Sequence, residues 1–394
     1  MPPSRTLGRM KQIHAGDRSQ HHLRSVTIPD SAAGAGARVR VGTPAALLAI
    51  VPYLLGFVPE SSLVVIGAEP PGGAIKVTMR YDLPDPPDAD LAADIAAHAM
   101  EVIGSQRLTP AVAIGYGPDA LVAPLAAALN EAAEDGEAMT EILRVDDGRY
   151  WSYTCASQSC CPPGGTAFDA AGYAEAAALA EVSGTTVLAG RDDVAESIAP
   201  LNGDIAASMR QATKRAEEHL TQLLAKVRKS SRLGAVRHMI ASEGLGAVAQ
   251  LVAAYRGGGQ FASDYQVAWL TVALKDMRVR DDAWARMDPR YGEAHRRMWT
   301  DVVRRAQPGH VAAPASLLAF VAWQAGNGVL ANVALDRALA DNPSYSMATL
   351  LRQVIGAGAP PSLARLPMTP EEVAAAYDGL DEGEDIDDQE CCPC

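Results

Sequence analysis

Aromatic residues are scarce in this sequence, and no apolar run is long enough to cross a bilayer. Phe, Trp and Tyr make up only 5% of the 394 residues, although 48% of all residues are hydrophobic. The core therefore has to consist largely of Ala, Val and Leu, which favours closely packed helices. The longest apolar stretch, residues 45–58, is interrupted by Pro52 and followed by Glu60. Since a transmembrane helix needs about 20 apolar residues, we expect no membrane segment.

Basic residues are fewer than acidic ones, 34 Lys and Arg against 47 Asp and Glu. The formal net charge is −13, and ten acidic residues but no basic residue fall within 371–390, which leaves a net charge of −3 for the rest of the chain. A nearly neutral body argues against a nucleic-acid-binding surface. The first residues, MPPSRTLGRMKQ, lack the apolar region of a signal peptide. We therefore expect a cytoplasmic protein with reduced cysteines and without a disulfide framework.

Established catalytic motifs are missing as well. The sequence contains no G-x-x-x-x-G-K-[ST] phosphate loop, no G-x-S-x-G turn, no H-E-x-x-H zinc motif and no complete G-x-G-x-x-G after a strand. These absences do not exclude an enzyme. An enzyme would have to use Cys155, Cys160 or Cys161 as nucleophile, and His98 is the only histidine of the predicted α/β region.

What is present divides the chain into four parts. Neither end of the chain has an apolar face to bury, so we expect removal of both ends to leave the thermal midpoint unchanged. The last residues include Cys391, Cys392 and Cys394, which could join other thiols around a metal, form mixed disulfides or have no role. The predicted parts are a disordered leader (1–40), an α/β domain (41–190), a helical domain (191–368) and a disordered acidic tail (369–394).

Strands and helices alternate in the α/β part. Apolar or alternating runs predict strands, and amphipathic stripes predict helices. This alternation, together with hairpins, predicts a mixed sheet whose strands are partly parallel. The expected strands are 62–67, 74–81, 109–117, 141–145 and 150–153, and the expected helices are 44–51, 90–103, 118–130 and 169–180.

The end of the 109–117 strand is a candidate ligand site. Gly115, Tyr116 and Gly117 lead directly into a helix that begins near Asp119. Ligands of α/β sheets usually lie beyond the carboxyl ends of the strands, and a helix N-terminus attracts anions. The alternative is that the glycines only make a turn, which is what a single short glycine pair favours.

After residue 190 the pattern is helical throughout. The segment 322–345, AWQAGNGVLANVALDRALADNPSY, resembles the latter half of a tetratricopeptide repeat, with Ala331, Leu335 and Ala338 at its packing positions. A stable array needs about three copies and only one good copy is present, so we expect a repeat-like hairpin within a bundle. The expected helices are 205–230, a second segment that ends at 257–259, and 263–277, 291–305, 313–326, 329–340 and 345–355.

A hairpin is predicted around Asp147 and Gly148, inside the segment DDGRYWSYTCASQSCCPPGGT (146–166). Both central residues of a type I′ turn need positive φ, which this pair tolerates. The strand after the turn contains Trp151 and delivers Cys155 to its far end. The residues that then exclude regular structure are Pro162, Pro163, Gly164 and Gly165.

Cys155, Cys160 and Cys161 therefore lie in or beside one loop, and three interpretations are open. They could be buried small apolar side chains next to a Pro-Gly turn. They could bind zinc with a fourth ligand from Asp169, His98 or a tail cysteine, although their spacing differs from the usual C-x₂₋₄-C pair. They could be redox-active, with Cys155 bonded to either neighbour. We expect close thiols with a packing or redox role and no complete four-ligand site.

Three stretches resemble a known family. PYLLGFVPESSLVVIG (52–67), RYDLP (80–84) and the cysteine segment are together similar to DUF4192, an actinobacterial family of unknown function. The resemblance covers residues 41–361, and the cysteine loop is the family's most recognisable feature. It implies a cytoplasmic protein of a high-GC actinobacterium and brings no established activity with it.

Together these features predict a cytoplasmic protein of two parts, an α/β domain followed by an all-α domain, that binds or scaffolds a protein partner. The competing hypothesis is a thiol-dependent or metal-dependent enzyme that acts at the cysteine loop. No cofactor is predicted, although the three thiols allow zinc. Metal analysis of the reduced protein, with and without Cys155→Ser, separates the two classes.

Overall fold

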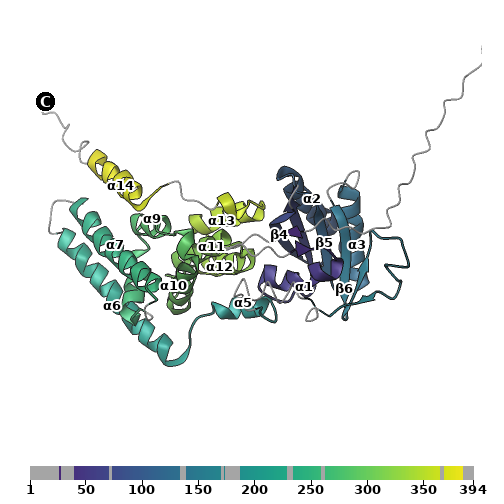
Figure 1. Cartoon of the computed structure of the whole chain (residues 1–394). Coiled ribbons are helices and arrows are strands. Elements are labelled where there is room, and N and C mark those ends of the chain that lie inside the picture. The colour runs from purple at the N-terminus through teal and green to yellow at the C-terminus, as the bar shows by residue number, and fades with distance from the viewer. Residues whose placement is uncertain are drawn as a thin grey trace, which may run out of the picture.

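The computed structural model describes most of the chain, and Figure 1 shows an α/β region beside a helical one. Nearly all of the helix predicted at 169–180 lies outside the described residues, as do most of the predicted leader and Cys391, Cys392 and Cys394. The described residues are 26–27, 40–70, 73–133, 139–169, 173, 187–228, 234–258, 262–363 and 368–384.

An eight-stranded sheet forms the first region, in the order β2-β1-β4-β3-β5-β6-β7-β8. Strand β3 pairs antiparallel with both β4 and β5, whereas β5 and β6 are parallel. The predicted mixed sheet with hairpins is thereby confirmed. The strands are β1 (Val26–Thr27), β2 (Arg40–Val41), β3 (Ser62–Glu69), β4 (Ala74–Asp82), β5 (Ala111–Tyr116), β6 (Met139–Asp146), β7 (Arg149–Ser152) and β8 (Thr166–Ala167).

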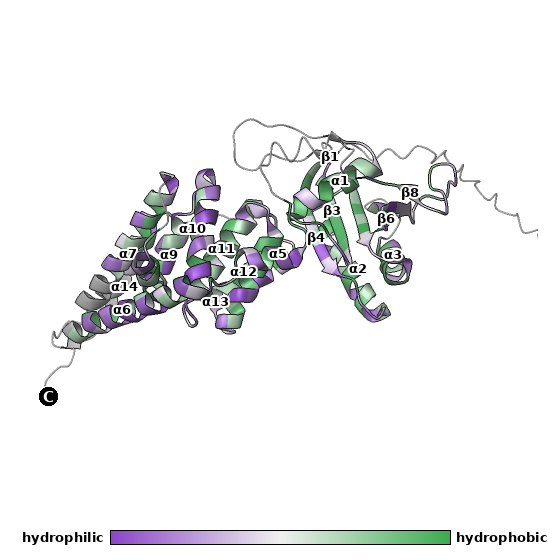
Figure 2. Cartoon of the chain, turned by 90° about the horizontal axis from the view of Figure 1, so that it is seen from below, coloured by the Kyte–Doolittle hydropathy of each residue, from purple (hydrophilic) through white to green (hydrophobic). Residues whose placement is uncertain are grey.

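Helices cover both faces of this sheet. Successive side chains of a strand point to opposite faces, so Leu63 and Val65 pack with α2 and α3, whereas Val64 and Ile66 pack with α1. Figure 2 shows β3 as apolar along its length, as expected for a strand buried on both sides. The helices of this region are α1 (Pro44–Leu55), α2 (Ala89–Ser105) and α3 (Asp119–Ala132).

The second region is helical, which confirms the predicted all-α part. Its α11 and α12 form a hairpin in which Ala331, Leu335 and Ala338 are fully buried. The tetratricopeptide-like character of this hairpin stays a prediction. The helices are α5 (Arg191–Ser197), α6 (Gly203–Arg228), α7 (Gly234–Arg256), α8 (Asp264–Ala273), α9 (Met277–Ala285), α10 (Gly292–Arg305), α11 (Ala312–Gln324), α12 (Gly328–Asp341) and α13 (Ser346–Gly356), with 3₁₀ turns η3 (Pro289–Tyr291) and η4 (Pro361–Leu363).

One predicted helix is shorter than expected, and the helix after it was not predicted. The helix expected at 263–277 ends near Leu274, and α9 begins after Asp276. The Asp276 carboxylate accepts hydrogen bonds from the backbone N–H groups of Arg278 (2.9 Å) and Val279 (3.3 Å). An aspartate that satisfies the free N–H groups of a first turn starts a new helix there, which separates α8 from α9.

The acidic tail carries the largest correction. The sequence predicts disorder for 369–394, but Pro370–Glu384 form the helix α14, which packs on α9. Val373 is buried in this contact, and Asp378 pairs with Arg278 across it (2.7 Å). The tail therefore does bury an apolar side chain, that of Val373, which the sequence did not indicate.

The predicted leader also contains a structured piece. Val26 and Thr27 form β1, which pairs antiparallel with β2 and parallel with β4 at the Thr27–Ala74 position. Residues expected to be disordered therefore extend the sheet at its edge, because an edge strand offers unpaired backbone groups that a short segment can satisfy.

The α/β and helical regions are in direct contact. The side-chain amide of Gln106 donates to the Gly358 carbonyl (2.6 Å), and His98 donates through Nε2 to the Gly356 carbonyl (2.7 Å). One apolar cluster continues from α1 and its face of the sheet into α10–α13. None of the described helices combines the length and the apolar character that crossing a bilayer requires.

Candidate functional site

The cysteine loop lies near one edge of the sheet, after the hairpin of β6 and β7. Asp147 (φ 46°) and Gly148 (φ 68°) occupy the left-handed region at its turn, where the sequence places them. The register pairs Val145 with Tyr150. Strand β7 then runs away from the turn and ends at Ser152, and Cys155 follows three residues later.

The loop after β7 folds back onto that strand. The Trp151 indole N–H donates to the Pro163 carbonyl (3.1 Å), and the Gly165 N–H donates to the Pro162 carbonyl (2.8 Å). The side chain of Arg149, the first residue of β7, donates through Nε to the Gly164 carbonyl (3.0 Å). Gly165 has φ 74°, and a Cβ there would lie 2.4 Å from the Trp151 ring. Only glycine fits this position, and the loop is closed against Trp151.

Three thiols gather in this loop. The Sγ atoms of Cys155 and Cys160 are 3.2 Å apart, and those of Cys155, Cys160 and Cys161 all lie within 4.8 Å of one another. Cys160 is exposed, and the other two are partly exposed. The Cys161 N–H donates to the Ser157 carbonyl (2.8 Å), which makes the tight turn that brings the three together. All three are free thiols.

The environment of Cys161 does not favour its thiolate. Burial raises the pKa of this thiol well above its usual range, and hydrogen bonds with Cys155 and Cys160 raise the pKa further. A nucleophilic cysteine normally has a pKa lowered by a nearby cation or helix N-terminus. Cys161 therefore lacks the activation that a thiol enzyme would need.

A buried carboxylate supports the start of the loop. Glu141 on β6 accepts hydrogen bonds from the hydroxyls of Ser152 and Thr154, the latter at 2.6 Å. The Ser152 hydroxyl in turn accepts a hydrogen bond from the Cys155 N–H (3.0 Å). Sequence reasoning missed this role of Glu141, although an acidic residue in an apolar strand, close across the hairpin to two hydroxyl residues, is the signal that marks it.

A partly buried arginine links this loop to the end of β5. Arg144 on β6 lies over the Trp151 ring, with its guanidinium carbon 3.8 Å from the ring centroid. It pairs with Asp146 (3.2 Å) and with Asp119 (3.6 Å), and Asp119 also accepts from the Tyr153 hydroxyl (2.7 Å). The strand-end candidate and the cysteine loop are thus neighbours, which sequence spacing alone did not indicate.

The end of β5 is less suited to an anion than the sequence allows. Asp119 stands in the first turn of α3, so a carboxylate already faces the positive end of that helix. The Gly117 N–H donates to the Val145 carbonyl (2.9 Å), and a Cβ at Gly115 would lie 2.3 Å from Val122. Burial raises the pKa of Tyr116 far above its usual range. These contacts favour the turn-only interpretation.

The comparison with known families fits this architecture. A family model described as Domain of unknown function (DUF4192) matches residues 44–362. The chain belongs to this family. The match runs from the start of α1 into η4, so the DUF4192 region contains both the cysteine loop and the α11–α12 hairpin, whereas α14 lies after it. Searches of curated proteins and of solved structures found no match.

Two proposed fourth metal ligands in the DUF4192 region can be placed. His98 is on α2 and bonds the Tyr81 hydroxyl on β4 (2.8 Å), so it lies at the contact with the helical region and away from the thiols. Asp169 follows β8 and is not part of the group of close ligand atoms. The tail cysteines lie outside the described residues. Of the described residues, the three thiols are the ligand atoms brought together.

Proposed function

We propose that this protein is a binding protein that holds one thiophilic metal ion, zinc by preference, at Cys155, Cys160 and Cys161. The observation that supports this best is the gathering of three sulfur atoms within 4.8 Å. Clustered thiolates select zinc and similar soft ions over magnesium or calcium, whose ligands are oxygens.

The spacing of the sulfurs suits a tetrahedral site. With Zn–S bonds of about 2.3 Å, neighbouring sulfurs of a tetrahedron are about 3.8 Å apart. The separations here, 3.2 Å for one pair and no more than 4.8 Å for the others, bracket that value. The three thiols would occupy one face of the tetrahedron, and the fourth position would face outward for water or for a donor from a partner.

The competing thiol enzyme receives less support. A cysteine nucleophile usually works with a histidine base. The four histidines with described side chains are engaged elsewhere: His98 bonds Tyr81, and the other three, His219, His295 and His310, bond residues of the helical region. The raised pKa of Cys161 also argues against a cysteine nucleophile.

The full-length, reduced protein should retain about one equivalent of zinc after dialysis, and Cys155→Ser or Cys160→Ser should abolish that retention. Loss of one of three thiolates removes a third of the ligands, which a loop with an open fourth position does not tolerate. Metal content would be measured by mass spectrometry of the digested protein. Cobalt loading would show the absorption bands of thiolate-ligated, tetrahedral Co²⁺.

Ser159→Ala is the matched control, because Ser159 lies in the same loop and its hydroxyl bonds only Ser157 among the described contacts. This variant should keep its zinc. A wild-type protein free of zinc after dialysis, or a Cys160→Ser variant with unchanged zinc, would refute the metal proposal. Reversible formation of a Cys155–Cys160 disulfide in a glutathione buffer would then support the redox alternative.

A protein partner is the second part of the proposed role. The helical region supports it, since helical hairpins commonly present apolar faces to other proteins and Leu350 on α13 exposes 55% of its surface. We place the protein in the reducing cytoplasm, where free thiols stay available to a metal. The high-GC actinobacterial origin stays a prediction from the family resemblance.

Charge introduced on α13 should disrupt partner binding more than charge introduced on α2. In affinity capture with the full-length protein, Leu350→Asp should lose the partners that the wild type retains. Leu91→Asp on α2 is the control, because Leu91 is similarly exposed (45%) but belongs to the α/β region. If Leu91→Asp loses the partners and Leu350→Asp keeps them, the interface lies on the α/β region instead.

A further inference from the structure

A pocket in the helical region collects positive charge. Its volume is about 420 Å³, within the range of small-molecule sites. It lies between the first turns of α6, the end of α10 and the end of α12, and its apolar lining includes Ile205, Met209 and Val311. Four arginines also line it, together with a single carboxylate from Asp341.

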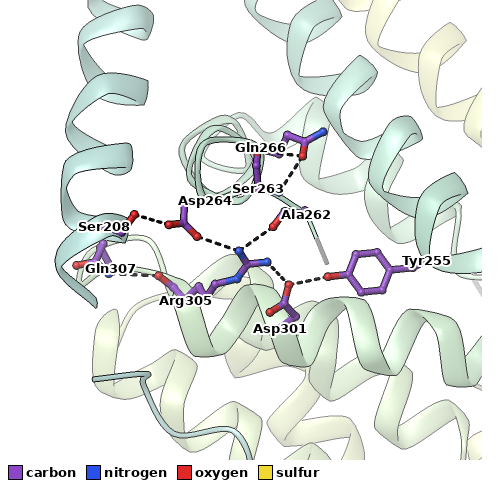
Figure 3. Close-up of polar contacts among 9 residues, drawn as sticks. All are labelled: Ser208, Tyr255, Ala262, Ser263, Asp264, Gln266, Asp301, Arg305 and Gln307. Carbon is purple, nitrogen blue, oxygen red and sulfur yellow. Dashed lines mark hydrogen bonds and ion pairs between the residues drawn. The ribbon is translucent and has the colours of Figure 1, made fainter. Parts of the chain in front are cut away.

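One of the four arginines is already neutralised. Figure 3 shows Arg305 between the carboxylates of Asp264 and Asp301, and it donates to the Ala262 carbonyl as well. The Asp301 carboxylate also accepts from the Tyr255 hydroxyl (2.6 Å). This network occupies the guanidinium of Arg305, so it contributes structure and little unmatched charge to the pocket.

The carboxylate of the pocket is occupied as well. Asp341, at the end of α12, accepts hydrogen bonds from the backbone N–H groups of Gly309 (2.6 Å), Val311 (2.9 Å) and Ala312 (3.0 Å). These groups lie at the start of α11, where backbone donors lack partners within the helix. The charge of Asp341 is therefore directed toward the helix terminus.

Of the remaining three arginines, two carry charge that the described residues do not match, and Arg337 is partly compensated by Asp341. Arg210 and Arg304 form no ion pair or side-chain hydrogen bond within the described ranges, and the Nε atom of Arg304 is buried. Arg337 donates to the Ile198 carbonyl. Burial lowers the pKa of Arg337, the Asp341 charge opposes this, and the Arg304 charge lowers that pKa further. Arg304 and Arg337 are thus close enough to repel each other.

Helix stabilisation explains only part of this arrangement. Arg304 stands in the last turn of α10, where a cation favourably meets the helix dipole. That role does not explain why Arg210 from α6 and Arg337 from α12 line the same cavity. Like charges that share a partly buried pocket raise the energy of the free protein, and an anion placed among them would relieve it.

We propose that this pocket binds a small molecule with a phosphate group, which Arg304, Arg337 and Arg210 contact, while its apolar body lies over Ile205 and Met209. A guanidinium donates two parallel hydrogen bonds to phosphate oxygens. A phosphate dianion also balances more of the charge of three guanidiniums than a ligand with one carboxylate would. The site is independent of the thiol loop, so a failure of either proposal leaves the other intact.

Calorimetric titration of the full-length protein tests this with three probes: inorganic phosphate, phenyl phosphate and benzoate. Phenyl phosphate should bind most tightly, because it alone combines a phosphate with an apolar ring. Arg304→Gln and Arg337→Gln should each weaken its binding by at least about tenfold, as expected for loss of a charge-assisted hydrogen bond. Arg304 and Arg337 are partly buried, so their variants could fold poorly. Arg210 is exposed, and Arg210→Gln gives the same test without that risk.

Arg290→Gln is the matched control. Arg290 is highly exposed, pairs with Asp288 and does not line the pocket, so its loss changes the net charge equally. This variant should bind phenyl phosphate like the wild type. The proposal is overturned if the wild type does not bind phenyl phosphate, if Arg290→Gln weakens binding as much as Arg304→Gln, or if benzoate binds as tightly as phenyl phosphate. Equal affinities for inorganic and phenyl phosphate would overturn the apolar half of the site.

Discussion

A chain that ends at residue 369 should unfold with a free energy about 3–4 kcal/mol below that of the full-length protein. Burial of an apolar side chain such as Val373 contributes about 2 kcal/mol. The Tyr377 hydroxyl donates to Asp281 (2.7 Å), which contributes about 1 kcal/mol. The Arg278–Asp378 pair adds about 1 kcal/mol, since solvent screens the half-exposed Asp378. Urea denaturation of both chains measures the difference.

A chain that ends at residue 384 is the control for this truncation. It keeps α14, removes only residues beyond the described range and should unfold like the full-length protein. A second variant, Val373→Ala, should account for about half of the loss, because it removes most of the buried apolar area and keeps the polar contacts. Identical unfolding of the chains that end at 369 and 384 would show that α14 does not stabilise the fold. Because α14 packs on α9, we expect residues 370–384 to be needed for full stability, in contrast to the expectation from the sequence that residues 370–394 are dispensable.

The fold class follows from the sequence because local patterns and tertiary packing agree over most of the chain. The continuous apolar run of β3 indicates a strand buried on both faces, and Asp147-Gly148 indicates the turn between β6 and β7. Both features depend on neighbouring residues alone. The α11–α12 hairpin is similar, since Asn327 caps α12 by accepting a hydrogen bond from the Leu330 N–H (2.9 Å).

Elements that depend on distant partners are the ones that the sequence does not reveal. Helix α14 is rich in acidic residues, and it is stabilised by the burial of Val373 and by contacts with Arg278 and Asp281 on α9, about a hundred positions earlier. Strand β1 exists because β2 and β4 offer backbone partners. Local composition in both segments indicates disorder, and only the tertiary contacts reverse that indication.

The candidate sites show the same division. The closeness of Cys155, Cys160 and Cys161 follows from a short loop with a Pro-Gly turn, so the sequence predicts it. The role of Arg144, which contacts Trp151 and Asp119, depends on the pairing of β5 with β6 and cannot be read from spacing. The arginine pocket is even harder to predict from the sequence, because its lining comes from three helices spread over more than a hundred residues.

Acidification from pH 7 to 4.5 should destabilise the protein through His295 on α10. Its ring is almost fully buried, and its Nε2 accepts a hydrogen bond from Arg256 (3.1 Å). Burial, and secondly the Arg256 charge, lower the pKa of His295 from 6.5 to about 4, while Asp288 opposes the shift. The folded protein therefore holds His295 neutral under conditions in which the unfolded chain takes up a proton.

The direction of the effect follows from proton linkage. The stability contributed by neutral His295 is fully present above pH 6.5 and is lost as the pH falls toward 4, where the folded state also protonates. The loss should reach about 2–3 kcal/mol at pH 4.5, since one pKa unit corresponds to about 1.4 kcal/mol. Unfolding free energies from urea denaturation at pH 7 and 4.5 give this value.

His295→Gln isolates this contribution from the carboxylates that titrate over the same range. Its side-chain oxygen can still accept the hydrogen bond from Arg256, but glutamine takes up no proton. The wild type should therefore lose about 2–3 kcal/mol more than the variant between the two pH values, because the carboxylate contributions cancel in the difference. Equal losses in both proteins would mean that His295 is protonated alike in the folded and unfolded states, and that its burial does not control the acid stability of the helical region.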